Sequence, residues 1–198
     1  MTATFLPMLF RMRHIARWGL MHNSLPESLS LHSLECAFLT HFLAHIGNIY
    51  LGKTHNADRL AAHAMYHDAA EILTGDLPTP IKYYNSEILR AYKNIESASA
   101  VKLLESLPEE LRQVYADYLQ GGSLSEAERY IIKAADKLCA YIKCVNETEA
   151  GNKEFNMPLK ACLEKVEALI PVCPELKYFM EHFIGAFSLS LDAIGASD

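Results

Sequence analysis

Four side chains that can bind a metal or move a proton occur close together in the stretch AMYHDAAEILTGDLPTP, residues 64–80. His67 and Asp68 are adjacent, Glu71 follows one helical turn later, and Asp76 comes in the loop beyond. Adjacent helical side chains diverge by about 100° and flank one ridge, so an imidazole and a carboxylate there can converge on one ion. The alanine and aliphatic residues around them indicate a largely buried segment, and buried charges need partners or a metal. The stretch therefore predicts that these charged groups are paired with partners or hold a metal ion.

Two other segments offer partners for this group. His32 lies in SLHSLE, at the start of an apolar helical pattern, and Asp136 lies at the edge of the apolar arc of IIKAADKLCAYI. Each residue alone has an ordinary interpretation. His32 fits a histidine satisfied near a helix cap, and Asp136 fits a solvated acid that pairs with Lys133 or Lys143.

The elements that must position these residues are predicted to be helices. Apolar residues recur at helical spacing, few β-branched runs alternate, and no internal repeat or linker interrupts the chain. We expect an all-α fold of about seven or eight helices in a single domain, residues 1–198. The predicted helices are one from Ser30 to Tyr50, one capped by Asp58 that runs through RLAAHAMYHDAAEIL and ends at Gly75, Asn85 to Glu105, Pro108 to Tyr118, one opened by the capping box Ser125 and Glu128, and two that follow Pro158 and Pro174.

Composition excludes several classes of protein. A net charge of −6 and a pI near 5.8 argue against a broad nucleic-acid surface, which needs clustered Lys and Arg. No run of about 18 apolar residues predicts a membrane span, and the N-terminal segment does not resemble a signal peptide. The five cysteines show no C-x-x-C pair and fit reduced core thiols in a cytoplasmic protein. His41 and His45 have the i, i+4 spacing of zinc-binding helices, but no acidic third ligand is near, so we expect a structural or exposed role.

The order His32, then His67–Asp68, then Asp136 resembles the metal-dependent phosphohydrolases of the HD-domain superfamily. More narrowly, ARWGLM, MYHDAAEILTGDLPTPIKYYNSEI and KAADKLCAYIKC are similar to the bacterial 5′-deoxynucleotidases of that superfamily. The similarity runs from about residue 10 to the C-terminus and is most specific in the GDLPTP loop.

This resemblance implies a role for each matched residue. His32, His67, Asp68 and Asp136 would hold one divalent metal cation, and this donor set suits Co²⁺, Mn²⁺, Mg²⁺, Zn²⁺ or Fe²⁺. Glu71 would act as the catalytic acid or base, and Arg17 would clamp the phosphate. The implied substrate-binding residues are Arg17, Trp18, His32, Asp68, Asp76, Leu77, Pro78, Thr79 and Asp136. Among them, Trp18 would crowd the 2′ position of the sugar, although on residue type alone it fits a core anchor, and Asp76 would accept from the 3′-hydroxyl.

One position departs from the family pattern. Such proteins often carry an acid directly before the first metal-binding histidine, and this chain has Leu31. Carboxylates behind a histidine ligand fix its tautomer. We hypothesise that Glu35, one turn after His32, supplies this carboxylate.

The resemblance implies a cytoplasmic homodimeric hydrolase that converts deoxyribonucleoside 5′-monophosphates to deoxynucleosides and phosphate. Two alternatives stay open. One is an HD phosphohydrolase acting on a nucleoside triphosphate or a guanosine alarmone, which would call for more clustered cations than Arg17 and Lys82. The other is a non-catalytic helical protein whose metal is structural and closed by four ligands.

Overall fold

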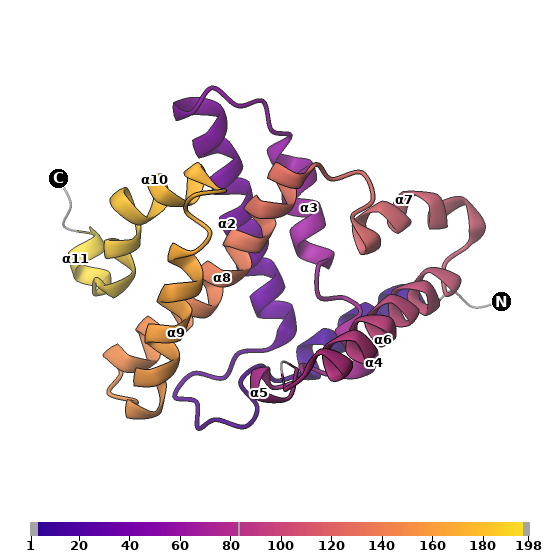
Figure 1. The fold of residues 1–198 in the computed structure, drawn as a ribbon, viewed down its shortest axis with the longest axis horizontal. Helices are drawn as coiled ribbons and strands as arrows, with labels where there is room; N and C mark the ends of the chain where they lie inside the picture. The colour runs from indigo at the N-terminus through magenta and orange to yellow at the C-terminus, as the bar shows by residue number, and fades with distance from the viewer. Residues whose placement is uncertain (1–3, 83, 196–198) are drawn as a thin grey trace. The chain divides into compact units, whose positions relative to one another are not determined.

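The computed structural model describes residues 4–82 and 84–195, without the side chains of Thr79 and Leu191. Within these ranges the chain is helical and contains no β-strand, so the predicted all-α fold is confirmed. Seven of the α-helices have nine or more residues. The α-helices are α1 (Phe5–Leu9), α2 (Leu29–Tyr50), α3 (Ala57–Tyr66), α4 (Glu71–Thr74), α5 (Thr79–Lys82), α6 (Ser86–Glu105), α7 (Glu109–Gln120), α8 (Glu126–Glu149), α9 (Asn156–Glu167), α10 (Pro174–His182) and α11 (Leu191–Gly195), and the 3₁₀ helices are η1 (Phe10–His14), η2 (Lys153–Phe155) and η3 (Ile184–Ser188) (Figure 1). None of the described helices is long and apolar enough to cross a membrane.

The chain divides into two compact units. The first contains residues 1–22, 26–35 and 62–124, and the second contains residues 23–25, 36–61 and 125–198. The predicted single domain stays a prediction.

The first unit has a core formed where α1 and the segment after α3 pack against α6. Its buried side chains are Phe5, Ala69, Leu103, Leu104 and Leu107. Tyr66, Ile72 and Tyr115 are among the half-buried residues that cover this core. Helices α4 and α5 also contact α6, as Figure 1 shows. The turn and loop residues that form the candidate site are therefore attached to this packed helical core.

The helix predicted through residues 59–73 is interrupted. Helix α3 ends at Tyr66, residues 67–70 form a turn, and α4 begins at Glu71. The ring Nδ1 of His67 lies 2.7 Å from the carbonyl oxygen of Ala64, which an uninterrupted helix would use for the backbone N–H of Asp68. At the other end, Asn56 and not Asp58 caps α3, since the Asn56 side chain accepts from the backbone N–H of Arg59.

Other predicted boundaries are confirmed. Asn85 caps α6 by accepting from the backbone N–H of Ile88, and α10 begins at Pro174. Ser125 and Glu128 form the predicted capping box of α8. Helix α9 is predicted to follow Pro158 but begins earlier, at Asn156, because a proline in the first turn of a helix costs no intrahelical hydrogen bond.

The second unit is built on α8, which packs along α9 (Figure 1). All five cysteines are buried in the core, as predicted, and none of them forms a disulfide in the part of the chain that the structure describes. His45 is exposed, and His41 is half-buried with its Nε2 3.1 Å from Asp58 Oδ1, which confirms the expected structural or exposed role of this pair.

Glu147 is a fully buried carboxylate on α8 that organises the second unit. It accepts hydrogen bonds from the backbone N–H groups of Ser24 and Leu25 at 2.9 and 3.1 Å and from Asn152 Nδ2 at 2.8 Å. It also pairs with Lys143. Burial alone would raise the pKa of Glu147, but these donors outweigh it and hold the pKa well below its usual value.

Glu147→Gln is expected to lower the free energy of unfolding by about 3 kcal/mol at pH 7, because it leaves the Lys143 ammonium buried without its counter-charge. A carboxyl group whose pKa is lower in the folded state stabilises the protein above its unfolded pKa of about 4.3. This stabilisation is lost progressively as the pH falls below that value. Denaturant unfolding from pH 7 to pH 3 should therefore show a smaller acid-induced loss in Glu147→Gln than in the wild type. The exposed Glu149→Gln on the same helix serves as the control, and parallel pH profiles for all three proteins would contradict this account.

Candidate active site

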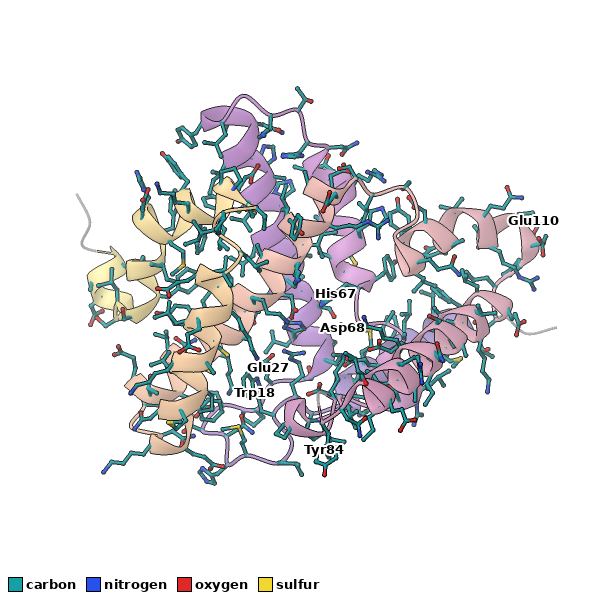
Figure 2. The ribbon with its side chains drawn as sticks, viewed as in Figure 1. Trp18, Glu27, His67, Asp68, Tyr84 and Glu110 are labelled. Carbon is teal, nitrogen blue, oxygen red and sulfur yellow. The ribbon has the colours of Figure 1, made fainter. Side chains whose placement is uncertain are left out.

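Two imidazoles and a carboxylate converge in the first unit. His32 lies in the first turn of α2, and His67 and Asp68 lie in the turn between α3 and α4. Asp68 Oδ2 is 3.5 Å from His32 Nε2 and 3.2 Å from His67 Nε2, and one ligand atom from each residue lies within 4.8 Å of the others. The two rings are 5.3 Å apart at an interplanar angle of 57°. Figure 2 marks His67 and Asp68 within the ribbon. Three of the four predicted metal ligands are thus brought together.

The protonation of His67 tests whether these groups fit a cation. Its Nδ1 donates to the carbonyl oxygen of Ala64, so in the neutral ring Nε2 carries a lone pair directed at Asp68. A lone pair and a carboxylate oxygen 3.2 Å apart repel each other unless a proton or a metal ion lies between them. Backbone fixation of the opposite ring nitrogen is also the usual arrangement for metal-binding histidines. The cluster therefore fits a divalent cation.

The Asp68 carboxyl group stays ionised in this site. Burial raises its pKa, but the charge and hydrogen bonding of His67 and His32 outweigh burial and hold the pKa of this carboxyl well below its ordinary value. A carboxylate that stays ionised is the form that binds a metal.

The pKa of Glu71 is shifted in the opposite direction. It is only 5 % exposed, and its pKa is raised to about 8, first by burial and then by the negative charges of Asp68 and Asp76. Lys82 and Arg17 oppose this rise, and Lys82 Nζ lies 3.9 Å from Glu71 Oε1. Two neighbouring carboxyl groups with separated pKa values are typical of acid–base sites.

Arg17 enters the site from the turn at residues 17–20, directly after the bridge residue Ala16. Its Nη1 is 3.6 Å from Asp68 Oδ2, and its Nε donates to Glu27 Oε1 at 2.8 Å. The arginine predicted to clamp a phosphate is therefore close to the candidate metal ligands.

Trp18 has a backbone conformation that tryptophan rarely adopts. Its φ is +57°, and among the described residues no other non-glycine residue has a positive φ. Such a conformation costs about 1–3 kcal/mol and occurs mostly at functional sites. The Trp18 backbone hydrogen-bonds to Asp76, while burial raises the pKa of that carboxyl. Trp18 is half-buried, so it is not the fully buried core anchor that its residue type would suggest.

The predicted sugar-binding loop follows α4. Gly75 ends this helix with φ +72°, a conformation that glycine adopts without strain, and Asp76, Leu77 and Pro78 follow as half-buried residues. The side chain of Thr79 lies outside the part of the chain that the structure describes.

Asp136, the fourth predicted ligand, belongs to the second unit. It lies on α8 with its side chain 22 % exposed, and its Oδ2 is 2.7 Å from Lys137 Nζ. Its role as a metal ligand stays a prediction.

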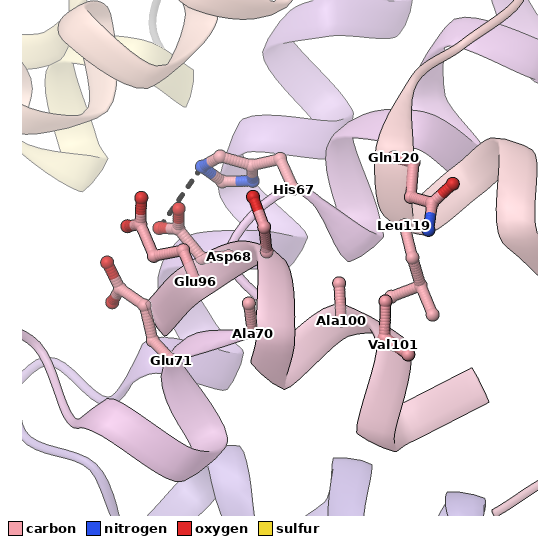
Figure 3. Close-up of a pocket in the computed structure, with 10 residues that line it drawn as sticks. His67, Asp68, Ala70, Glu71, Glu96, Ala100, Val101, Leu119 and Gln120 are labelled. Carbon is pink, nitrogen blue, oxygen red and sulfur yellow. Dashed lines mark ion pairs between the residues drawn. The ribbon is translucent and has the colours of Figure 1, made fainter. Parts of the chain in front are cut away.

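A cavity of about 600 Å³ adjoins the cluster within the first unit (Figure 3). At one end His67, Asp68 and Glu71 line it together with Glu96, and the other end is more apolar. The residues at that other end are Ala100, Val101, Leu119 and Gln120. The cavity gives the candidate site space for a small organic substrate.

Sequence reasoning missed Glu27. Glu35, proposed above as the carboxylate behind His32, is exposed, whereas Glu27 Oε1 lies 3.7 Å from His32 Nδ1. Glu27 precedes α2 and so has no place in a helical pattern that could have indicated it.

Comparisons with known structures agree with this fold. An HD-domain phosphohydrolase from Listeria innocua superposes with a TM-score of 0.82 at 20 % identity, over 97 % of this chain and 92 % of that one. A cyanophage S-2L HD phosphohydrolase, solved with dA and one catalytic Zn²⁺ ion, superposes with a TM-score of 0.67 at 20 % identity, over 90 % and 95 % of the two chains. The fold is that of the HD-domain phosphohydrolases. In this chain, the adjacent His67–Asp68 pair lies in the candidate metal site.

A narrower assignment follows from sequence similarity. The 5′-deoxynucleotidase YfbR-like family matches residues 4–187. The 5′-deoxynucleotidase of Pectobacterium atrosepticum is 51 % identical over 190 residues, which cover 96 % of this chain and 94 % of that protein. The chain belongs to the YfbR-like 5′-deoxynucleotidase family.

Proposed function

We infer that the chain is a 5′-deoxynucleotidase, a phosphoric monoester hydrolase that converts deoxyribonucleoside 5′-monophosphates to deoxynucleosides and phosphate. The observation that carries this inference is the convergence of His32, His67 and Asp68 beside the buried Glu71 and Arg17. Membership of the YfbR-like family supports the same substrate class.

The proposed metal site consists of His32, His67 and Asp68, with Asp136 as the fourth ligand. A bound divalent ion would polarise a phosphoryl oxygen and lower the pKa of a water. Which ion the cell supplies depends on availability as well as on the donor set.

Arg17 and Glu71 act on opposite parts of the reaction in this proposal. The Arg17 guanidinium binds the non-bridging phosphate oxygens, for which its planar fork is suited. Water attacks phosphorus, the bond from phosphorus to the 5′-oxygen breaks, and the leaving oxygen ends with a proton. Glu71 moves that proton, either by taking it from the attacking water or by giving it to the leaving oxygen.

Sugar recognition is assigned to Trp18 and to the loop after α4. Trp18 crowds the 2′ position, Asp76 accepts from the 3′-hydroxyl, and Leu77, Pro78 and Thr79 form the wall beside the sugar. The Trp18–Asp76 hydrogen bond supports a joint role for the two residues.

Trp18→Ala is expected to admit ribonucleotides. Removing the indole opens the space that a 2′-hydroxyl would need, so the ratio of kcat/KM for dAMP to that for AMP should fall by about 10-fold or more, the size expected when a steric contact of 1–3 kcal/mol is lost. Trp18→Phe keeps an aromatic ring and should retain most of the preference. An unchanged ratio in Trp18→Ala would remove Trp18 from sugar selection.

Phosphate release from paired deoxyribo- and ribonucleoside 5′-monophosphates tests the function. The protein is stripped with a chelator, and Mn²⁺, Co²⁺, Zn²⁺ or Mg²⁺ is added back. Metal-dependent release from the deoxy series alone is the expected result. Equal release from both series would contradict sugar selectivity. If the protein hydrolyses no monophosphate but does hydrolyse a triphosphate or an alarmone, its activity is that of another kind of HD phosphohydrolase. The homodimer stays a prediction.

A further inference from the structure

Glu27 is a buried carboxylate beside two functional side chains. It is 8 % exposed, its Oε1 accepts from Arg17 Nε at 2.8 Å, and the same oxygen lies 3.7 Å from His32 Nδ1. One carboxylate thus faces both the proposed phosphate clamp and a proposed metal ligand. Figure 2 marks Glu27 together with Trp18, His67 and Asp68.

The backbone fixes this arrangement independently of the side chains. Ala16 and Ser28 form an isolated antiparallel bridge, and the Arg17 N–H donates to the Glu27 carbonyl oxygen at 2.9 Å. The Leu29 N–H donates to the Ile15 carbonyl oxygen at 2.9 Å. Residues 15–17 and 27–29 are therefore paired at the start of α2, which places Arg17 and Glu27 opposite each other.

We infer that Glu27 is a positioning residue that orients Arg17 toward the phosphate and His32 toward the metal. This inference rests on the proposed function.

Glu27 supplies a counter-charge for Arg17. A guanidinium this close to Asp68, with Nη1 3.6 Å from Oδ2, competes with a metal ion for that carboxylate. Glu27 supplies a separate counter-charge at Nε, so Asp68 is not the sole anion beside Arg17. Engagement of Nε also fixes the guanidinium plane and leaves phosphate recognition to the Nη1–Nη2 edge.

Glu27 also favours one tautomer of His32. Its Nε2 faces Asp68 and its Nδ1 faces Glu27. A carboxylate next to Nδ1 favours the proton on that nitrogen and therefore leaves the Nε2 lone pair for a metal. The Ala64 carbonyl oxygen does the same for His67, so both imidazoles are oriented from behind.

The test uses Glu27→Gln, which keeps the shape and the backbone pairing but removes the charge. Direct Mn²⁺ binding, followed by the loss of the free-ion EPR signal, should be about 10- to 100-fold weaker than in the wild type, the usual effect of losing a group behind a ligand. Calorimetric binding of inorganic phosphate to the metal-loaded protein should weaken about 10-fold, and KM for dAMP should rise with it. Glu27→Asp should restore part of each loss.

Two controls separate positioning from a merely structural ion pair. Glu128→Gln breaks the ion pair with Arg59 and should leave Mn²⁺ and phosphate affinity within about twofold, whatever its effect on the melting temperature. In an Arg17→Ala background, Glu27→Gln should no longer weaken phosphate binding but should still weaken Mn²⁺ binding through His32.

Mn²⁺ and phosphate affinities within twofold of the wild type in Glu27→Gln would overturn the inference, even if the melting temperature fell. Because both affinities are measured without a nucleotide, they test Glu27 separately from the reaction. A wild-type protein that binds Mn²⁺ and phosphate but does not hydrolyse deoxynucleotides would contradict the proposed function alone.

Discussion

Asp68→Ala is expected to lose divalent-metal binding and phosphate release together. Asp68 Oδ2 is the atom that both His32 Nε2 and His67 Nε2 face, at 3.5 and 3.2 Å, so its loss removes the carboxylate at the centre of the cluster. Lewis-acid stabilisation of a phosphoryl transition state contributes several kcal/mol, so kcat/KM for dAMP should fall by about 1,000-fold or more. Phosphate release and Mn²⁺ binding are measured on the same preparation.

Two variants complete this experiment. Asp68→Asn keeps the side-chain shape and should also fail to bind metal, which distinguishes loss of the ligand from loss of packing. Asp58→Ala removes an exposed carboxylate paired with His41 and should behave as the wild type. Normal metal affinity with Asp68→Ala would refute the site assignment. The same measurement on Asp136→Ala tests the ligand predicted from the second unit.

Glu71→Gln has the second-largest expected effect, and it should separate chemistry from metal binding. Glu71 is buried beside the cluster, and its pKa, raised to about 8, differs from that of the ionised Asp68. Loss of a general acid or base typically costs 10²- to 10⁴-fold in rate, so kcat for dAMP should fall by about that factor. Mn²⁺ affinity should stay within about threefold, because the ligand atoms remain.

The control for Glu71→Gln is Glu105→Gln, an exposed carboxamide substitution at the end of α6. It should change neither kcat nor metal affinity. A kcat for Glu71→Gln within tenfold of the wild type would show that Glu71 does not move the proton, and it would return this residue to a structural role.

Helical periodicity predicted the long elements well because they bury one continuous apolar face. Helices α2, α6 and α8 begin within one residue of the expected positions, and the caps at Asn85 and Ser125 explain why. The error at α3 has a different origin. Residues 59–74 contain no glycine or proline, yet the helix ends at Tyr66, where the His67 ring occupies the Ala64 carbonyl oxygen. The helix therefore ends beside a side chain with a proposed function in metal binding, and not at a helix-breaking residue.

The candidate site was predictable only where residue type and local spacing carry the information. His67, Asp68 and Glu71 stand out in a segment rich in alanine, and the structure places His32 beside them. Glu27 could not be found in this way. Its contact with Arg17 depends on the pairing of residues 15–17 with 27–29, a long-range arrangement that leaves no periodic signal in the sequence.

The central claim is that one divalent ion bound at the His–Asp cluster enables hydrolysis of a deoxynucleoside 5′-monophosphate. The most direct measurement is a titration of chelator-stripped protein with Mn²⁺ that follows bound ion by EPR and phosphate release from dAMP in the same samples. Activity should be absent without metal, and the bound-ion signal and phosphate release should saturate together at one ion per chain. Full activity in the stripped protein, or saturated binding without any phosphate release, would contradict it.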